Sequence, residues 1–464
     1  MESDTIVAIV TPPGQGGVGI VRTSGPLSPS LAERFYPKLA SPWRSHRLRH
    51  GTLVDPSVGR SVDRGLACLM VAPGSYTGED VFEMHCHGSP LVLAHIVRLC
   101  EREGCRQARP GEFTLRAFLN GRLALDQAEA VLDVVRANSN TGLDLAIQQL
   151  AGWLSARIEP LRHELIGALA HMEAMVDFVE DDIPARLEAS AVSQLEKVRH
   201  GVETLLRGAE QGIVLREGAS LAIVGSPNVG KSSIMNGLLG LERSIVTPVA
   251  GTTRDTIEEH LQIGGIAFRT VDTAGLTNSE DVVERIGVER SVRALAGADV
   301  ALLVLDGSRP YGPPDEMAVE TLAGTPASLN GNSQRQRLIL ALNKSDLPTE
   351  LDASHIITRL HPGEVVSSTT LQPDGLASLR QALERAAVGG ERHEVTVGNV
   401  RHQEALRRAG EALSTALDGM DQGTPLDLVS LDVRAAAVAL GEITGADVDD
   451  ELLDRIFRDF CIGK

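Results

Sequence analysis

A strand, loop and helix signature for phosphate binding constrains this chain more than any other feature. Residues 225–232 read GSPNVGKS, which fits the pattern G-x-x-x-x-G-K-[ST] of a loop whose backbone N–H groups wrap a phosphate chain. The apolar run at 220–225 predicts a buried parallel strand before this loop, and residues 232–239 predict a helix after it. The phosphates would then lie at a helix N-terminus, with Lys231 on the β- and γ-phosphates and the Ser232 hydroxyl on Mg²⁺.

A second motif favours a guanine nucleotide over an adenine nucleotide. Residues 338–342 predict another buried strand, which delivers the sequence NKSD at residues 343–346. Asp346 can accept hydrogen bonds from the N1–H and N2–H₂ edge of guanine, which adenine does not offer, while Lys344 can cover the base. A site with paired polar groups of this kind rejects an analogue that leaves them unpaired. We therefore predict GTP as the substrate.

Two further strand-like runs complete the expected sheet. The run at 267–272 ends in DTAG, where Asp272 can hold the Mg²⁺ shell and the Gly275 N–H can reach the γ-phosphate. The run at 300–305 predicts one more buried strand. Each motif alone could be an ordinary loop. Their order along the chain, each at the end of a strand, favours a nucleotide-binding domain of the α/β class.

The residue that activates the attacking water is less evident from the sequence than the nucleotide contacts are. The position after DTAG is Leu276, where small Ras-like GTPases carry a Gln that orients the attacking water. Asn228 in the phosphate loop could coordinate a monovalent cation through its side-chain carbonyl, or it could be a turn residue. Glu284 could orient the water, or it could be a plain surface carboxylate. Arg254 could be an arginine finger or a solvated charge.

Residues 247–255, TPVAGTTRD, have the composition of a switch loop. Gly251 and Thr252 stand where such a loop would close over the cation with backbone carbonyls, and Thr253 is the natural second ligand of Mg²⁺. A cation beside the phosphates would supply the positive charge that an arginine finger gives elsewhere.

Composition and charge narrow the class of protein. The chain has 464 residues, of which 42% are apolar and 23% charged, so it is globular and long enough for roughly two to four domains. It has no apolar run of about eighteen residues, and its acidic start lacks the features of a signal peptide, so we expect no membrane association. A net charge of −18 argues against a protein that coats nucleic acid non-specifically, although the basic cluster at 44–50 could be an RNA patch or a solvated loop. Five cysteines without a C-x-x-C pair fit reduced thiols in a cytosol.

The composition changes along the chain in a way that predicts domains. Short β-like runs at 5–10 and 65–71 indicate a small α+β domain, and helical periodicity such as that of 126–136 follows it. The expected boundaries are 1–120 for the first domain, 121–216 for the first helical half, 217–384 for the nucleotide domain and 385–464 for the second helical half. The economical interpretation is a nucleotide domain inserted at exposed turns between two halves of one helical domain.

Two other patterns suggest sites that we do not favour. Residues 14–19, GQGGVG, match the dinucleotide fingerprint G-x-G-x-x-G, but a strand-like run follows them instead of a helix, so a glycine-rich turn is expected. His85, Cys86 and His87 could suggest a metal site. On a strand, however, the two histidines point to one side and Cys86 to the other, and no second cluster supplies further ligands.

The chain resembles the family of tRNA modification GTPases called MnmE or TrmE, essentially from end to end. In the N-terminal part, the motifs that carry the resemblance are TPPGQGGVGI at 11–20, TGED at 77–80, RPGEF at 109–113 and AFLN at 117–120. Further along they are PNVGKSS at 227–233, VAGTTRD at 249–255, VERIG at 283–287, GEITG at 441–445 and CIGK at 461–464.

This resemblance implies an architecture and partners. It implies an N-terminal α+β domain that forms a homodimer and binds a one-carbon tetrahydrofolate of the 5-formyl or methylene type, a helical domain, and an inserted Ras-like P-loop G domain. The implied reaction, with an FAD-dependent partner subunit in a heterotetramer, adds an aminomethyl or carboxymethylaminomethyl group to carbon 5 of the wobble uridine in certain tRNAs. The implied location is the bacterial cytoplasm. Pairing of the G domains in the presence of K⁺ would activate hydrolysis.

The resemblance also assigns roles to matching positions. It implies K⁺ ligands Asn228, Thr247, Val249 and Thr252, Mg²⁺ ligands Ser232 and Thr253, a catalytic set of Glu284, Lys231 and Asn228, and a folate site of Arg22, Glu83, Arg122 and Lys464, with Cys461 near it. The GTP contacts would be Asn228, Val229, Gly230, Lys231, Ser232, Ser233, Thr247, Pro248, Val249, Ala250, Gly251, Thr252, Thr253, Asp272, Thr273, Ala274, Gly275, Asn343, Lys344, Asp346, Ser367, Ser368 and Thr369.

Some positions depart from the family pattern. Arg122 stands where the family commonly has Lys, so a cation is retained at the folate site. Residues 367–369 only loosely resemble the base-supporting S-A-x element, and residues 84–86 differ from the family, which weakens any role for Cys86.

Two other functions are compatible with a G domain. A GTPase that switches ribosome assembly or scaffolds RNA would carry an RNA-binding module, such as a KH module, after the G domain. The tail here is helical and ends in CIGK, which favours tRNA modification. The other function is that of a nucleotide-binding protein without useful turnover. Its rate of GTP hydrolysis would not change when potassium replaces sodium.

Overall fold

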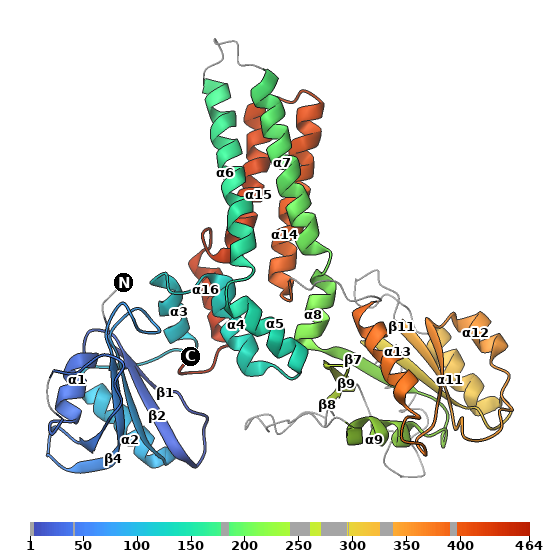
Figure 1. The fold of residues 1–464 in the computed structure, drawn as a ribbon, viewed down its shortest axis with the longest axis horizontal. Helices are drawn as coiled ribbons and strands as arrows, with labels where there is room; N and C mark the ends of the chain where they lie inside the picture. The colour runs from blue at the N-terminus through green and yellow to red at the C-terminus, as the bar shows by residue number, and fades with distance from the viewer. Residues whose placement is uncertain are drawn as a thin grey trace. The chain divides into compact units, whose positions relative to one another are not determined.

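The computed structural model describes residues 4–39, 42–177, 185–241, 260–270, 295, 297–324, 337–389 and 397–464. The chain divides into two compact units. The first comprises Met1–Leu132, Gln149–Arg162 and Val438–Lys464, and the second comprises Asp133–Gln148 and His163–Ala437. Figure 1 shows the elements of both units.

The first unit is built on a mixed sheet with the strand order β3-β4-β5-β2-β1-β6. Its strands are β1 (Ile6–Ile9), β2 (Gly16–Ser24), β3 (Arg49–Val54), β4 (Ser61–Met70), β5 (Val81–Gly88) and β6 (Arg106–Gln107). Its helices are α1 (Ser28–Phe35), α2 (Pro90–Arg102), α3 (Glu112–Leu119) and α16 (Asp450–Arg458). The α+β class and the strands expected near residues 5–10 and 65–71 are thus confirmed.

One expectation in this sheet is wrong. Residues 16–19, expected in a glycine-rich turn, belong to β2 and lie opposite β5, with a register shift between Gly16 and Gly19. The reason is close packing, because a Cβ on Gly19 would come within 2.5 Å of Leu93 Cδ1 on α2. Gly19 thus lets α2 approach this strand closely, and residues 16–19 do not form the loop that a dinucleotide fingerprint requires before a helix.

The sheet of the second unit has the order β12-β11-β10-β7-β9-β8, in which neighbours are parallel except for the pair β8 and β9. Its strands are β7 (Ala219–Val224), β8 (His260–Ile263), β9 (Ile266–Thr270), β10 (Val300–Asp306), β11 (Arg337–Asn343) and β12 (Glu364–Ser368). Its helices are α9 (Lys231–Leu241), α11 (Pro313–Gly324), α12 (Ser354–Leu360) and α13 (Ala377–Val388). The predicted strands at 220–225, 267–272, 300–305 and 338–342 are confirmed within a residue or two, as is the helix after the phosphate loop.

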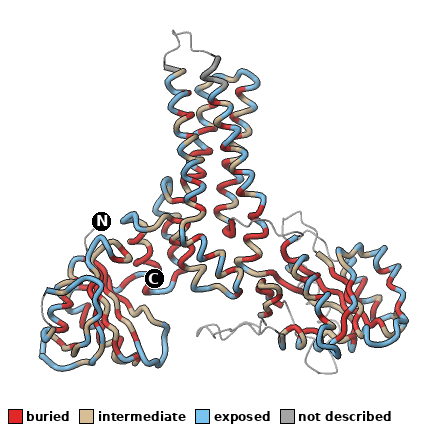
Figure 2. The backbone as a smooth tube through the Cα atoms, in the orientation of Figure 1, coloured by how far each residue is buried: buried red, intermediate tan, exposed pale blue. Residues whose placement is uncertain are grey.

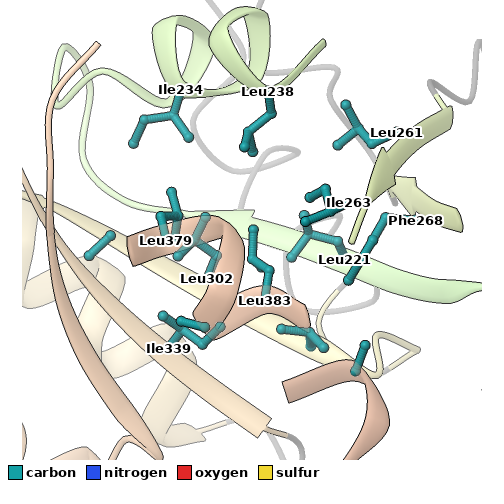
Figure 3. Packing of buried hydrophobic residues seen from close by; sticks show 14 of the residues in the cluster. Leu221, Ile234, Leu238, Leu261, Ile263, Phe268, Leu302, Ile339, Leu379 and Leu383 are labelled. Atoms are coloured by element: carbon teal, nitrogen blue, oxygen red, sulfur yellow. The ribbon is translucent and has the colours of Figure 1, made fainter. Parts of the chain in front are cut away.

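Both faces of this sheet are covered. In β10 every residue is buried, and Leu302 lies in one hydrophobic cluster while Leu303 lies in another. Figure 3 shows the first cluster, in which Ile234 of α9 and Leu383 of α13 meet the strands. A continuous apolar strand is the pattern expected when helices cover both faces of a parallel sheet. The polar residues at the carboxyl ends of these strands therefore lie at the edge of the sheet, next to the loops that follow the strands.

The helical part consists of long helices that run side by side (Figure 1). They are α6 (Ser155–Asp177), α7 (Ala185–Leu206), α14 (Val400–Asp421) and α15 (Leu426–Thr444), with α4 (Leu125–Arg136), α5 (Asn140–Leu150) and α8 (Ala209–Glu217) as shorter members. In α14 the residues His402, Leu406, Ala409, Leu413 and Ala416 are buried, and Figure 2 shows such buried stripes along the long helices. This spacing is that of an amphipathic helix. The elements β7 to α13 lie between α8 and α14 in the sequence, so the segment that forms the second sheet interrupts the helical part.

None of the described helices combines the length and the apolar character that a membrane span requires.

Candidate functional site

The phosphate loop lies between the end of β7 and the start of α9. Its backbone has special conformations, because Asn228 has φ 64° and Gly230 has φ 100°. A Cβ on Gly230 would lie 2.2 Å from Asn343 Nδ2, so both the backbone and the space require glycine there. The exposed residues Ser232 and Ser233 occupy the first turn of α9, where N–H groups of the helix are free to bind an anion.

Lys231 is held inside this loop by neutral groups. Its ammonium donates to the carbonyl oxygens of Gly225 and Ser226, each at 2.8 Å. Burial lowers the pKa of Lys231 below its ordinary value, because removing a charge from water disfavours the charged form. No described carboxylate pairs with Lys231. A half-buried cation held only by carbonyl oxygens is suited to exchange them for the oxygens of a phosphate.

A side-chain hydrogen bond joins the phosphate loop to residues 343–346, which we call the base motif. Asn343, at the end of β11, donates from Nδ2 to the Val229 carbonyl oxygen at 2.8 Å, across 114 residues of sequence. Val229 and Asn343 are both buried, so this bond is shielded from water. The next residue, Lys344, has φ 62°, and its Nζ lies 2.6 Å from Asp306 Oδ2 at the end of β10. The two segments that carry the motifs predicted from sequence are therefore bonded to each other in the fold.

The loop after β12 supports the same motif. The Thr369 hydroxyl donates to Asp346 Oδ1 at 2.5 Å, and the Ser368 hydroxyl donates to Asn343 Oδ1 at 3.2 Å. Asp346 itself is exposed. Ser367 is exposed, whereas Ser368 and Thr369 are buried. The structure therefore brings Ser368 and Thr369 to the base motif.

Many of the residues that the sequence singles out lie outside the described residues. These are Thr247, Pro248, Val249, Ala250, Gly251, Thr252, Thr253, Arg254, Asp272, Thr273, Ala274, Gly275, Leu276 and Glu284.

A second polar group lies in the first unit, on paired strands. Arg22 of β2 and Glu83 of β5 are direct neighbours in the ladder, and Arg22 Nε donates to Glu83 Oε1 at 2.8 Å. The guanidinium lies 5.6 Å from the ring centre of Phe113 and 6.0 Å from that of Tyr76, a cation–π geometry. Burial raises the pKa of Glu83, but hydrogen bonds from His85 and Arg22 and their charges outweigh it, so the pKa is lowered overall.

The other expected members of this group come from distant segments. Gly78 lies in the loop that follows Tyr76, and a Cβ there would meet Arg122 Cγ at 3.3 Å. The carbonyl oxygen of Lys464 accepts from the N–H of Phe113 at 3.2 Å. Phe113 therefore contacts Arg22 through its ring and Lys464 through its backbone N–H. Arg122 and Cys461 are both exposed.

Sequence reasoning missed one partner in this group. His85 Nε2 lies 3.0 Å from Glu83 Oε2, on the same face of β5 and two residues further along. The alternation of side chains on a strand was the available signal, since residues i and i+2 share a face.

The metal reading of residues 85–87 finds no support. His87 lies 2.8 Å from Asp63 through Nδ1, while Cys86 is buried, and burial raises its pKa to about 12. Within the described part of the chain, no group of three or more His, Cys, Asp or Glu side chains could hold a metal ion. All five cysteines, at 68, 86, 100, 105 and 461, are free thiols.

Comparison with known proteins gives matches along the whole chain. The family model for the GTP-binding protein TrmE N-terminus matches residues 5–122, and the model for the MnmE helical domain matches residues 125–461. A protein of Chloroflexus aurantiacus named tRNA modification GTPase MnmE is 45% identical over 469 residues, covering 100% of each chain. A protein of the same name from Heliobacterium modesticaldum is 43% identical over 477 residues, again covering 100% of each.

Among solved structures, the chain is similar to Aquifex aeolicus Era bound to GDP·AlF₄⁻, with 28% identity and a TM-score of 0.26. That match covers 42% of this chain and 66% of the other.

Proposed function

The chain belongs to the MnmE family of tRNA modification GTPases and hydrolyses GTP to GDP and phosphate, and from this premise we propose how it acts. We propose a potassium-stimulated GTPase that modifies carbon 5 of the wobble uridine in certain tRNAs. It acts with an FAD-dependent partner subunit and a one-carbon tetrahydrofolate. The bond from Asn343 to Val229 is the observation that carries the GTP site, because it joins the phosphate loop and the guanine motif into one surface.

The phosphate side of this site is assigned to consecutive residues. The N–H groups of residues 228–233 would surround the β-phosphate at the start of α9, and Lys231 would leave its two carbonyl partners for the β- and γ-phosphates. The exposed hydroxyl of Ser232 fits a ligand of Mg²⁺, with Thr253 as the second protein ligand. When bound, Mg²⁺ neutralises the charge that grows between the β- and γ-phosphates.

The base side is assigned to residues 343–346 and the loop after β12. Asp346 would accept from guanine through its carboxylate, which Thr369 already orients at Oδ1. Lys344 would cover the base from its position beside Asp306. Ser367, Ser368 and Thr369 would support the base edge. Rejection of adenine then follows from the donors that it lacks.

The potassium site is assigned to Asn228 with Thr247, Val249 and Thr252. Asn228 is exposed, and no described residue hydrogen-bonds to its side chain, so its amide oxygen is available to a cation. When bound, K⁺ adds positive charge beside the phosphates. Glu284 is assigned to orient the attacking water, the role that Leu276 cannot perform.

The folate site is assigned to Arg22, Glu83, Arg122 and Lys464, with Cys461 nearby. The Arg22–Glu83 pair beside Phe113 supports this, because a charged pair next to an aromatic ring suits a ligand with a flat ring and carboxylates. When bound, the folate supplies the one-carbon unit. We further propose that the N-terminal domain forms the homodimer and that the homodimer binds the FAD-dependent subunit as a heterotetramer.

The deciding experiment compares GTP hydrolysis in potassium and in sodium, for the wild type and for Asn228→Ala. We expect the wild type to turn over GTP at least about tenfold faster in potassium, which corresponds to about 1.4 kcal/mol of barrier. Asn228→Ala should lose this stimulation and still bind GDP, because its phosphate contacts come from the backbone. Equal wild-type rates in both salts would refute the cation assignment.

The chain offers a matched control for this variant. Asn236 is also an exposed asparagine, about one turn along α9 from the end of the phosphate loop. Asn236→Ala should keep the potassium stimulation. If it lost the stimulation as well, a general disturbance of α9 would explain the effect, and Asn228 would no longer be assigned to the cation.

A further inference from the structure

A forked ion pair lies next to the phosphate loop, between Arg309 in the segment that follows β10 and Asp315 in the first turn of α11. Arg309 donates to both carboxylate oxygens of Asp315, from Nη1 to Oδ2 and from Nη2 to Oδ1, each at 2.8 Å. The Asp315 side chain is only 4% exposed. A fork of this kind combines charge with a fixed geometry, which Lys cannot reproduce.

This fork is bonded to the phosphate loop itself. Ser226, the second residue of the loop, donates from its hydroxyl to Asp315 Oδ1 at 2.6 Å, and Arg309 Nη2 lies 3.1 Å from the same hydroxyl. The carbonyl oxygen of Ser226 is one of the two acceptors that hold Lys231. Ser226 thus connects the fork on one side to the phosphate-binding lysine on the other.

The same segment also reaches the base motif. Asp306 Oδ2 accepts from Lys344 Nζ at 2.6 Å, and Arg309 Nε lies 3.8 Å from that oxygen. The backbone N–H and the hydroxyl of Ser308 donate to Asp306 Oδ1 at 3.0 and 2.6 Å. Arg309 consequently stands between two buried carboxylates, one bonded to the phosphate loop and one to the base motif.

We propose that Arg309 and Asp315 are positioning residues for GTP, which hold the phosphate loop at Ser226 and connect it to Lys344. The inference rests on the GTP site proposed above and adds residues that no nucleotide motif contains. Ser226 has no other described side-chain partner that would fix the loop on this side. Without the fork the loop has more conformations to lose on binding, so nucleotide affinity falls.

A purely structural role is the competing explanation. The N–H of Gly312 donates to Asp315 Oδ2 at 3.2 Å, so Asp315 also stabilises the turn before α11. The two roles differ in what they affect. A structural role lowers thermal stability and leaves the affinity for nucleotide unchanged, whereas a positioning role lowers the affinity in a folded protein.

The test uses the full chain and a fluorescent GDP, with equilibrium affinity, dissociation rate and Tm as readouts. Arg309→Lys keeps the charge but loses the fork, and Ser226→Ala removes the connection to the loop. We expect each variant to bind GDP roughly tenfold more weakly, which is a typical size for one coupled contact. The KM for GTP should rise by more than kcat falls. The double variant should be little worse than either single variant, because both remove the same connection.

A matched fork in the same domain serves as the control. Arg385 of α13 donates to Glu364 of β12 from Nε and Nη2 at 2.8 and 2.7 Å, on an exposed surface. Arg385→Lys should bind GDP like the wild type. Unchanged GDP affinity in Arg309→Lys and Ser226→Ala would overturn the inference, whether or not Tm fell. A wild type that bound no GDP would instead refute the nucleotide site itself.

Discussion

Glu112 illustrates at the scale of one residue how a buried carboxylate can set the response of a domain to acid. Its Oε2 accepts from the Arg109 N–H at 2.7 Å, and its Oε1 accepts from Arg106 at 2.6 Å and from Arg116 at 3.1 Å. Burial raises the pKa of Glu112, but the hydrogen bonds from Arg106, Arg109 and Arg116 outweigh it, so the pKa is lowered overall. Its charged form is therefore a source of stability.

This gives a prediction about pH. The stabilisation is complete above the ordinary glutamate pKa of about 4.3 and is lost as the pH falls through the lower pKa of the folded state. Glu112→Gln keeps the shape without the charge, so we expect it to lower the free energy of unfolding at pH 7 by about 2–3 kcal/mol. Between about pH 5 and pH 3, its Tm should fall less steeply than that of the wild type.

The control for this prediction is Glu101→Gln. Glu101 is an exposed carboxylate on α2, and its Oε1 accepts from Gln107 Nε2 at 2.8 Å. Glu101→Gln should change the free energy of unfolding by no more than about 0.5 kcal/mol. Parallel curves of Tm against pH for the wild type and Glu112→Gln would show that Glu112 is not responsible for the acid sensitivity.

Residues of the site were predictable where the chemistry lies in consecutive positions. The phosphate loop is one case, because eight adjacent residues supply the backbone, the lysine and the hydroxyl. Arg309 and Asp315 were not predictable, since they meet Ser226 across 83 and 89 residues and belong to no motif. Their roles follow only from tertiary contacts.

At the scale of elements, α8 and the segment that returns from the G domain approach each other very closely. A Cβ on Gly212 of α8 would lie 2.1 Å from the carbonyl oxygen of Val397. Val397 is 1% exposed, and the atom that the added Cβ would meet belongs to its backbone. Neither α8 nor the Val397 segment can therefore easily move away. These two connections are where the inserted domain leaves and rejoins the helical part of the second unit.

We therefore expect Gly212→Ala to destabilise the protein by about 1–3 kcal/mol, although alanine is the better helix former. Gly167 in α6 is the matched control, because a Cβ there would meet nothing within 4 Å. Gly167→Ala should raise the free energy of unfolding by about 0.5–1 kcal/mol. Both are measured by chemical denaturation. Stabilisation by Gly212→Ala would mean that α8 and Val397 are further apart than the structure has them.

Elements were predictable from sequence where burial leaves a periodic or continuous apolar pattern. The strands around the nucleotide site have such a continuous pattern, because helices cover both faces of the sheet and the strand sequences are almost wholly apolar. Residues 16–19 do not, since three of the four are glycine and carry no side-chain pattern. Their strand conformation depends on pairing with β5, which no local signal reveals.

At the scale of the whole molecule, residues far apart in sequence complete one sheet-bearing unit. The first unit contains residues up to Leu132 together with Val438–Lys464. Ile462 pairs with Pro110 in an antiparallel bridge, and the Gly111 N–H donates to the Cys461 carbonyl oxygen at 3.4 Å. The sequence alone contained the motif CIGK but not its partner, because a short segment has no periodicity that identifies what it pairs with.

Gly463 is the residue that this arrangement constrains most. It has φ 98°, and a Cβ on it would lie 2.6 Å from the carbonyl oxygen of Ile9 in β1. We expect Gly463→Ala to lower the stability of the first unit by about 1–3 kcal/mol, because the backbone would be strained and the segment displaced. Ile462→Ala is the control, since Ile462 is 61% exposed and should change little. Amide exchange at β1 and α3 would report the loss locally. If exchange there were the same in both variants, residues 461–464 would not contribute to the stability of this unit.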